Sequence, residues 1–204
     1  PDARVALEEG EVFDLLEKHA SGFQGIATAD YPRYGRSFWE CVLDDAWTFQ
    51  QSTVFDTELF GGKSNCLFWE KGKGSLAYSD SARVQGLEAW KSWGIAVSQM
   101  REIPVALHTA SAFDNNTAAI VPHKPEQLPA IWCFCSSPEY NEAVRRIDQK
   151  LNVTNATLVK VPFDLEHWTK VAAEKYPNGL PHPYSDDPTQ WIFHGHPVGS
   201  DDPL

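Results

Sequence analysis

The apolar and polar positions of the chain predict short helices and strands in an irregular order. Over residues 4–20, apolar side chains recur every three or four positions among acids, which predicts an amphipathic helix that ends near Gly22. Residues 23–28 and 37–43 are expected to be strands. The intervening ADYPRYGR segment is expected to be a loop because Pro and Gly interrupt regular structure.

The next segment predicts a β-hairpin with a basic tip. Residues 65–69 and 75–78 are strand-like, and Lys71-Gly72-Lys73-Gly74 stands between them as a glycine-containing turn. Residues 82–92 suit a short helix.

The second half alternates strands and helices more clearly. Strands are expected at 95–100, 105–109, 118–121 and 157–162, with a turn at 113–117 where Asp and Asn favour bends. Helices are expected at 128–136, at 138–150 with Ser137 as its cap, and from Asp164 to about 175. Prolines make the tail irregular, with one turn expected near 189–193.

These elements predict a mixed α/β (α+β) domain with a mixed twisted sheet and flanking helices. The order is not the regular βαβ alternation of a doubly wound fold. We expect three regions: a helix at 1–21 that links to a preceding domain, a domain at 22–175, and an extended Pro-rich tail at 176–204. The chain lacks an initial Met and ends in turn-like residues, which favours a piece of a longer protein.

Charge and composition narrow the classes of function. The net charge is −11, which argues against nonspecific binding to a polyanion. The charge is uneven, however, since residues 61–101 carry six bases against three acids. No apolar run is long enough to span a membrane, no signal peptide is visible, and four cysteines in a chain of this size suit reduced thiols, so we expect a cytoplasmic protein with no membrane partner.

Common catalytic and cofactor motifs are absent from the sequence. Neither Gly61-Gly62 nor Gly72-x-Gly74 opens the strand-to-helix unit that a nucleotide-like cofactor requires, and no P-loop, HExxH or GxSxG pattern occurs. His194-x-His196 lacks further ligands at zinc spacing, and Cys133-x-Cys135 suits buried cysteines. No catalytic residue and no metal site are therefore predicted.

Several segments together resemble a known family. The stretch from Gly25 to Glu40 (GIATADYPRYGRSFWE) is similar to the G-x-T-G-D-N-x-R-F-x-R-x-W/F-W/F-E signature, with Ala29 where the signature has glycine. The same order continues in segments 65–70, 93–100, 113–117 and 131–139, and then in 147–164 and 184–195. The chain resembles the target recognition domain of type IIG restriction–modification enzymes and of BREX- or DISARM-like N6-adenine DNA methyltransferases.

That resemblance implies a DNA-reading module. Its partners would be double-stranded DNA and the methyltransferase catalytic domain of the same polypeptide, which would bind S-adenosylmethionine. Endonuclease activity of the parent enzyme is left open by the resemblance. No cofactor is expected in this chain. The resemblance implies a target-recognition-domain-like fold with 22–175 as the recognition domain, and the residues expected to contact DNA are Arg33, Tyr34, Arg36, Lys63, Asn65, Lys71, Lys73, Gln99, Arg101, Asn115 and Asn116.

The residue types suggest how DNA would be contacted. Arginine reads guanine by two hydrogen bonds and asparagine can read adenine, whereas lysines on a turn suit phosphates. Each residue also has a structural interpretation: Arg33 or Arg36 can pair with Asp30 or Glu40, and turn asparagines often bond their own backbone.

Two other classes of function remain open. The acidic chain ends suit a protein-interaction or scaffolding module. A metal-dependent nuclease would need acids and a lysine to converge on an ion, and Asp56, Glu58, Glu70 and Lys73 are the residues available.

Overall fold

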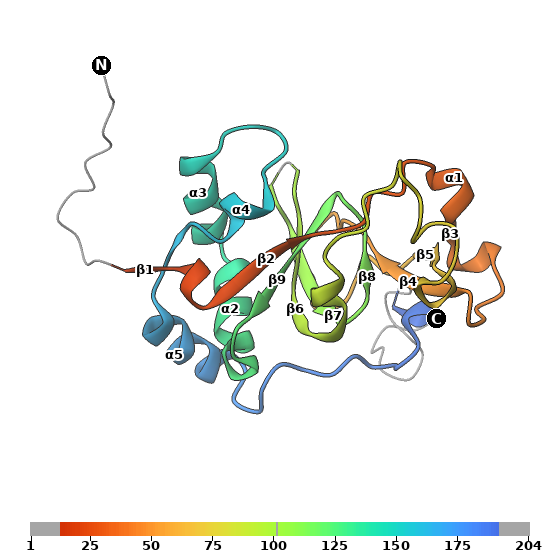
Figure 1. Ribbon diagram of the computed structural model, residues 1–204. Helices are drawn as coiled ribbons and strands as arrows, with labels where there is room; N and C mark the ends of the chain where they lie inside the picture. Colours follow the sequence, from red (N-terminus) through yellow and green to blue (C-terminus); the bar gives the residue numbers. More distant parts are fainter. Residues whose placement is uncertain (1–12, 101, 192–204) are drawn as a thin grey trace, which may run out of the picture.

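The protein has a mixed α/β fold built around two four-stranded sheets. A computed structural model describes residues 13–100 and 102–191. Figure 1 shows most of the helices gathered at one end beside the first sheet, with the second sheet and a short helix at the other end. The mixed α/β class expected from the sequence is confirmed.

The first sheet is antiparallel throughout. Its strand order is β2 (Ala20–Gln24), β9 (Thr117–Pro122), β6 (Trp93–Ser98) and β7 (Val105–Thr109). The central strands are buried almost continuously, because helices or the second sheet cover both faces. Such strands carry apolar runs rather than a strict alternation.

The second sheet is mixed. Its order is β3 (Gly35–Ser37), β5 (Asn65–Phe68), β4 (Trp47–Gln51) and β8 (Ala112–Phe113), and only the β4–β8 pair is parallel. The hydrogen bond from the amide of Asp114 to the carbonyl of Gln51 (3.0 Å) extends this pairing into the turn before β9. The loop after β8 is therefore held where the two sheets meet.

Helices flank the first sheet on one side. They are α2 (Leu128–Cys135), α3 (Pro138–Ile147), α4 (Asn155–Leu158) and α5 (Leu165–Lys175), and α1 (Tyr31–Tyr34) belongs to the other end. The caps expected at Ser137 and Asp164 both form, since their side chains accept hydrogen bonds from the amides three residues on. None of the described helices has the length and apolar character that crossing a bilayer demands.

Short 3-10 turns and a small strand pair complete the described chain. The pair joins β1 (Asp14–Leu15) to β10 (Pro162–Phe163). The 3-10 turns are η1 (Leu16–Lys18), η2 (Phe38–Glu40), η3 (Glu70–Gly72), η4 (Leu87–Lys91), η5 (Pro125–Gln127) and η6 (Pro188–Gln190).

The main core lies between the first sheet and the helices, and it extends beyond the expected domain limits. Leu16 and Ala20, which precede residue 22, are fully buried within it. Tyr176 and Leu180, which follow residue 175, pack against it. Neither expected boundary coincides with a break in packing. Residues 176–191 contain one 3-10 turn, η6, and are otherwise irregular.

Three strand predictions and several helix predictions match the structure. The segments expected at 95–100, 105–109 and 118–121 are β6, β7 and β9 within two residues. The expected helices at 128–136, 138–150 and 164–175 are α2, α3 and α5. The sequence predicts these elements well because their residues are mostly apolar and buried, or because a capping residue marks where the helix begins.

The N-terminal helix prediction is wrong where the structure describes it. Residues 14–24 form β1, η1 and β2, and residues 1–12 lie outside the described part of the chain. β2 pairs residue by residue with Ala118–Pro122 of β9, so the end of the expected helix belongs to a strand. Tertiary pairing thus overrides the local periodicity.

The predicted hairpin at 65–78 is also wrong. Its first strand exists as β5, but that strand pairs with β3 and β4 rather than with 75–78. Glu70, Lys71 and Gly72 all take left-handed backbone conformations, and successive i to i+3 hydrogen bonds carry the chain through turns until Ser79. Leu76 anchors this turn segment, because it is buried in a separate apolar cluster with Ile26 and Leu67.

Two further strand predictions fail for a shared reason, which is local capping. Ser37 and Glu40 form a reciprocal capping box that begins η2, so the strand expected at 37–43 ends at Ser37. Thr154 caps α4, so the strand expected at 157–162 is reduced to the short β10.

Candidate nucleic-acid interface

The arginine loop forms, and its two arginines have different surroundings. The Arg33 guanidinium is exposed and lies over the ring of Tyr34, 5.1 Å from its centroid. Tyr34 is buried, and its hydroxyl is 3.3 Å from Oγ of Ser75. Arg36 donates to the carbonyls of Pro32 and Gly35 rather than pairing with an acid. Of these two arginines, Arg33 is the one whose guanidinium faces solvent.

Lys63 was expected to contact a phosphate at the surface, but the structure places it in the interior. Its side chain is buried, with 3% of its surface exposed, and Nζ donates to Oγ of Ser111. The ring of Trp191 lies above the amine at 5.9 Å. Burial lowers the pKa of Lys63 to about 7. Lys63 is therefore an interior residue that faces the tail, and it is not available to a duplex.

The lysines of the expected hairpin tip remain at the surface in turn η3 and just after it. Lys71 is paired with Asp45 at 2.5 Å, and both side chains are exposed. Lys73 is exposed. Lys63 is buried and Arg36 is bonded to its own turn, so the basic residues expected to contact DNA do not form one surface; these residues are Arg33, Arg36, Lys63, Lys71 and Lys73.

The predicted asparagines instead converge on a pocket beside the second sheet, at the turn that leads into β9. Asn65, Asn115 and Asn116 line it together with Gln50 and Ser52. Its volume is about 640 Å³, and the loop at 26–31 forms the remaining wall. We call this hollow, whose polar lining residues are Thr28, Tyr31, Gln50, Ser52, Asn65, Asp114, Asn115 and Asn116, the amide pocket.

A single acid lies in the amide pocket. The Asp114 carboxylate accepts hydrogen bonds from Oγ of Ser52 (2.6 Å) and from the amide of Asn116 (3.0 Å). Burial raises the pKa of Asp114, and these hydrogen bonds oppose that rise. Burial also raises the pKa of Tyr31, with a smaller contribution from the nearby charge of Asp114. The pocket is therefore polar, and it contains one partly buried carboxylate whose two oxygens both accept hydrogen bonds.

A second groove adjoins the amide pocket. It shares Ala27 and Asn115 with that pocket and has a volume of about 630 Å³. Two exposed cations line it, Arg83 and Lys150, and neither makes an ion pair with any residue that the structure describes. Its remaining polar lining residues are Gln24, Gln85, Gln99, Asn152, Thr154 and Asn155.

Gln99 lines the second groove, and its side chain hydrogen-bonds to other residues of the groove. It is 3% exposed, exchanges two amide hydrogen bonds with Gln24 (2.7 and 3.1 Å), and donates to the carbonyl of Val153 (2.9 Å). Gln24 also donates to the carbonyl of Asn115 at 2.6 Å. This network ties β2, β6 and the Asn115 turn together, so Gln99 orders the groove rather than projecting from it.

Backbone pairing fixes Arg83 beside the loop at 26–31. Ala27 and Arg83 exchange both of their backbone hydrogen bonds, at 3.1 and 2.8 Å. Gln85 donates to the carbonyl of Gly25 at 2.9 Å. A segment about 55 residues away in sequence thus forms one rim shared by the two hollows.

Three residues that line the two hollows were not among the site residues predicted from the sequence: Gln50, Arg83 and Lys150. Gln50 and Gln51 are adjacent polar residues on one strand, and since neighbours on a strand face opposite sides, at least one of them had to be buried or line a site. Arg83 and Lys150 carried no local signal, because long-range packing alone brings them together. Arg101 lies outside the described residues, as do His194 and His196.

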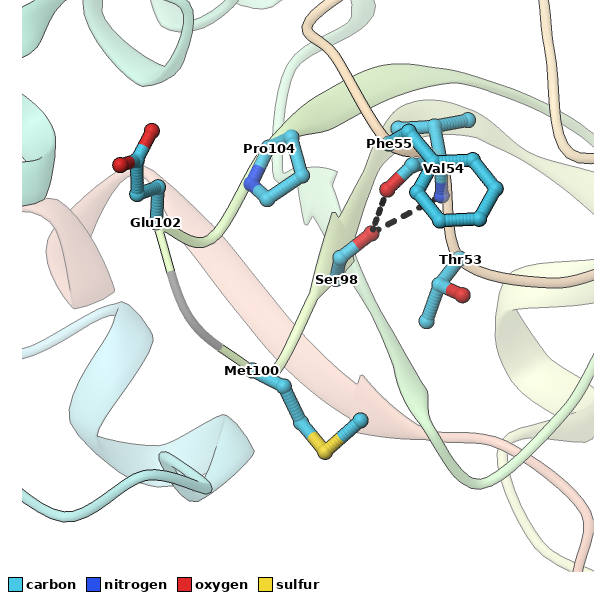
Figure 2. A pocket seen from close by; sticks show the side chains of 7 residues that line it. All are labelled: Thr53, Val54, Phe55, Ser98, Met100, Glu102 and Pro104. Carbon is cyan, nitrogen blue, oxygen red and sulfur yellow. Dashed lines mark hydrogen bonds between the residues drawn. The ribbon is translucent and has the colours of Figure 1, made fainter.

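A third hollow is lined mainly by apolar side chains. Figure 2 shows Ser98 turned toward the backbone of Val54, with Pro104 lying between Ser98 and Glu102 in this view. Oγ of Ser98 accepts from the Val54 amide (3.0 Å) and donates to its carbonyl (3.3 Å). Because its hydroxyl is committed to this backbone, Ser98 is not poised for chemistry.

The nuclease set does not assemble in the described chain. Among residues 13–100 and 102–191, no three His, Cys, Asp or Glu side chains gather closely enough to hold a metal ion. Glu58 lies beside β7, where its amide donates to the carbonyl of Val105, whereas the amide of Glu70 donates to Ala46. The four cysteines are free thiols, and Cys133 and Cys135 are both buried.

Comparison with known proteins adds no assignment. No family model matches this chain, and a search of the curated proteins finds no match to it.

Proposed function

We propose that this chain is the DNA-reading module of a larger N6-adenine DNA methyltransferase of a restriction–modification or phage-defence system. It would work in the cytoplasm on double-stranded DNA. The observation that carries the proposal is the pair of adjoining hollows, the amide pocket and the second groove, which share Ala27 and Asn115.

The side chains of the two hollows suit the two tasks of DNA recognition. Amides present a hydrogen-bond donor and acceptor together and discriminate base edges, whereas cations contact phosphates without reading sequence. The amide pocket supplies the first kind of group, and Arg83 and Lys150 at the second groove supply the other. The chain as a whole is acidic, so a local pair of unpaired cations is the electrostatic feature that favours this face.

The backbone at Ala29 agrees with the resemblance seen in the sequence. The family signature has glycine at this position, and Ala29 takes a left-handed conformation with φ of 60°. Glycine is the residue that adopts this conformation without steric cost. Ala29 also lines the amide pocket, so the signature loop forms part of the proposed interface.

Methyl transfer is assigned to a separate domain of the parent protein. Binding of S-adenosylmethionine requires a glycine-rich turn between a strand and a helix. In the described chain Gly72 ends η3 and Gly74 lies in the turn segment after it, so this glycine pair does not form such a turn. The residues on these two hollows would bind and orient the duplex.

The test is salt-dependent binding of a fluorescent random-sequence duplex. In an Arg83→Gln/Lys150→Gln double variant we expect weaker binding and a shallower slope of log K against log salt. Each lost phosphate contact should reduce that slope by about 1.

An Arg146→Gln/Lys170→Gln double variant is the matched control. It removes the same charge from exposed lysine and arginine side chains that pair with Glu142 and Glu166 on α3 and α5. Equal loss of affinity in both double variants would mean that only net charge matters. No binding by the wild-type chain at low salt would refute the proposal for this chain.

A protein-docking function is the second candidate, and one observation favours it. Trp39, Val42 and Leu43 are exposed by 63%, 79% and 45% within one short segment. Apolar side chains clustered at a surface are typical of interfaces. In the proposed methyltransferase this segment would pack against a neighbouring domain, and in a scaffolding protein it would be the main functional surface.

A further inference from the structure

Within the described chain, the side-chain amide of Gln50 is buried and both of its polar atoms lack a hydrogen-bond partner. The residue is 1% exposed, and the two atoms are Nε2 and Oε1. A buried polar group without a partner costs about 1–3 kcal/mol of stability. A structural role for Gln50 would require partners, as its neighbour illustrates.

Gln51 has the partners that Gln50 lacks. Its Nε2 donates to the carbonyls of Gly61 (3.1 Å) and Leu107 (2.9 Å), and its Oε1 is 3.0 Å from Nδ1 of His108. The two glutamines are consecutive on β4, so their side chains leave opposite faces of the sheet. Gln51 is directed toward the first sheet, and Gln50 lines the amide pocket.

The amide pocket has the size and walls for a flat polar ligand. Its 640 Å³ are lined by small residues at Ala27 and Ala29 and by the half-exposed ring of Tyr31. Ser52 and Asp114 are already bonded to each other, whereas the Gln50 amide is not bonded. A planar ring can stack on a tyrosine while its edge meets the amide.

We propose that the amide pocket holds one nucleobase and that Gln50 is the residue that reads its hydrogen-bonding edge. The inference rests on the proposed DNA-reading function and names the group that is read. An amide offers one donor and one acceptor side by side, and in a base pair only adenine presents the complementary N7 and N6 atoms in the major groove. The terminal torsion of glutamine is broad, so the amide can turn toward an occupant.

The base could be presented in two ways that share this chemistry. A paired adenine would present only its major-groove edge to the Gln50 amide and would not stack on Tyr31, whereas an unpaired base in a single strand would enter the pocket whole and stack on that ring. In both cases the Gln50 amide has already lost its water on folding, so the hydrogen bonds it makes to a base are not offset by further dehydration.

The direct experiment is an NMR titration of the full chain with the four nucleosides separately. The probe is the Gln50 side-chain NH₂ resonance, assigned by its loss in a Gln50→Leu variant. We expect a saturable shift of that resonance with at least one nucleoside, at millimolar Kd, and at least a tenfold weaker Kd in the variant. No saturable shift of any side-chain NH₂ resonance with any nucleoside would overturn the inference, and this result needs neither the assignment nor a stable variant.

Thermal unfolding separates a reading residue from a structural one. Gln50→Leu should retain or raise Tm, because leucine fills a similar volume without an unpaired amide. Gln149→Leu is the matched control, since Gln149 is exposed and lines neither hollow. It should leave nucleoside binding unchanged. A large fall in Tm for Gln50→Leu, with unchanged nucleoside affinity, would show that the amide is structural.

Oligonucleotides then distinguish the two sources of the base and the two proposals. If a paired base is read, Gln50→Leu keeps its affinity for random duplex and loses enrichment of adenine at one position. If an unpaired base is read, single strands bind more tightly than duplex and nucleosides compete. Unchanged sequence enrichment in the variant would refute the role of Gln50 and leave the DNA-reading function standing.

Discussion

Replacement of Lys63 by methionine should stabilise the protein at neutral and acidic pH. Methionine is unbranched and similar in length, so it can fill the same space beneath Trp191 without a charge. The pKa of Lys63 is lowered from 10.5 to about 7 by burial. Between these values the unfolded chain holds a proton that the folded chain lacks, so the stability of the wild type rises with pH across this window.

The size of the effect follows from that difference in pKa. At about 1.4 kcal/mol per pKa unit, the full cost of burying the charged amine is about 5 kcal/mol below pH 7. The hydrogen bond to Ser111 and the contact with Trp191 each offset about 1 kcal/mol. Lys63→Met should therefore gain about 3 kcal/mol at pH 6, and this gain should fall to zero or slightly below it as pH approaches 10.5.

Urea unfolding followed by tryptophan fluorescence, at several pH values from 6 to 10, measures this directly. Lys73→Met is the control, because Lys73 is exposed and should show a small difference that hardly varies with pH. A gain for Lys63→Met that is the same at all pH values, or a loss at pH 6, would refute the argument that the buried amine titrates near neutrality.

Three further predictions concern the pocket loop and the thiols. Gly25→Ala places a Cβ 2.1 Å from the backbone oxygen of Asp114, so we expect the free energy of unfolding in urea to fall by about 1–3 kcal/mol. A variant as stable as the wild type would show that the Asp114 backbone moves away at no cost. Ala29→Gly should gain up to about 1 kcal/mol, because Ala29 has a φ of 60°, and a clear loss would contradict that backbone. In the native chain at pH 8, iodoacetamide should spare Cys66, Cys133 and Cys135, since burial raises the pKa of each, and mass spectrometry should find four labels after unfolding. Rapid native labelling of Cys135 would refute its burial.

Elements that carry their own signals were predictable from the sequence. Ser137 and Asp164 mark helix starts by their side-chain oxygens, and the apolar runs at 93–98 and 105–109 require burial whatever their partners. The hairpin failed because the two strands that pair with β5 come earlier in the chain, and glycine spacing at its tip carries no information about them. The helix predicted before residue 21 failed in the same way, since β9 lies about 100 residues away.

The candidate site was predictable only in part. Asn65, Asn115 and Asn116 were identified, and the structure brings them to one pocket. Lys63 was misplaced because a charged residue next to two glycines has no local mark of burial, and its cover, Trp191, is distant in sequence. Arg83 reaches the second groove through a bridge to Ala27, a contact that no spacing rule anticipates.

Hydrogen–deuterium exchange with and without a random-sequence duplex tests most directly that the two hollows face DNA. Protection should appear at 26–31, 83–85, 114–116 and 150–155, the segments that line them. Protection confined to 39–43, or unchanged exchange at saturating duplex and low salt, would contradict a DNA-reading surface at these hollows.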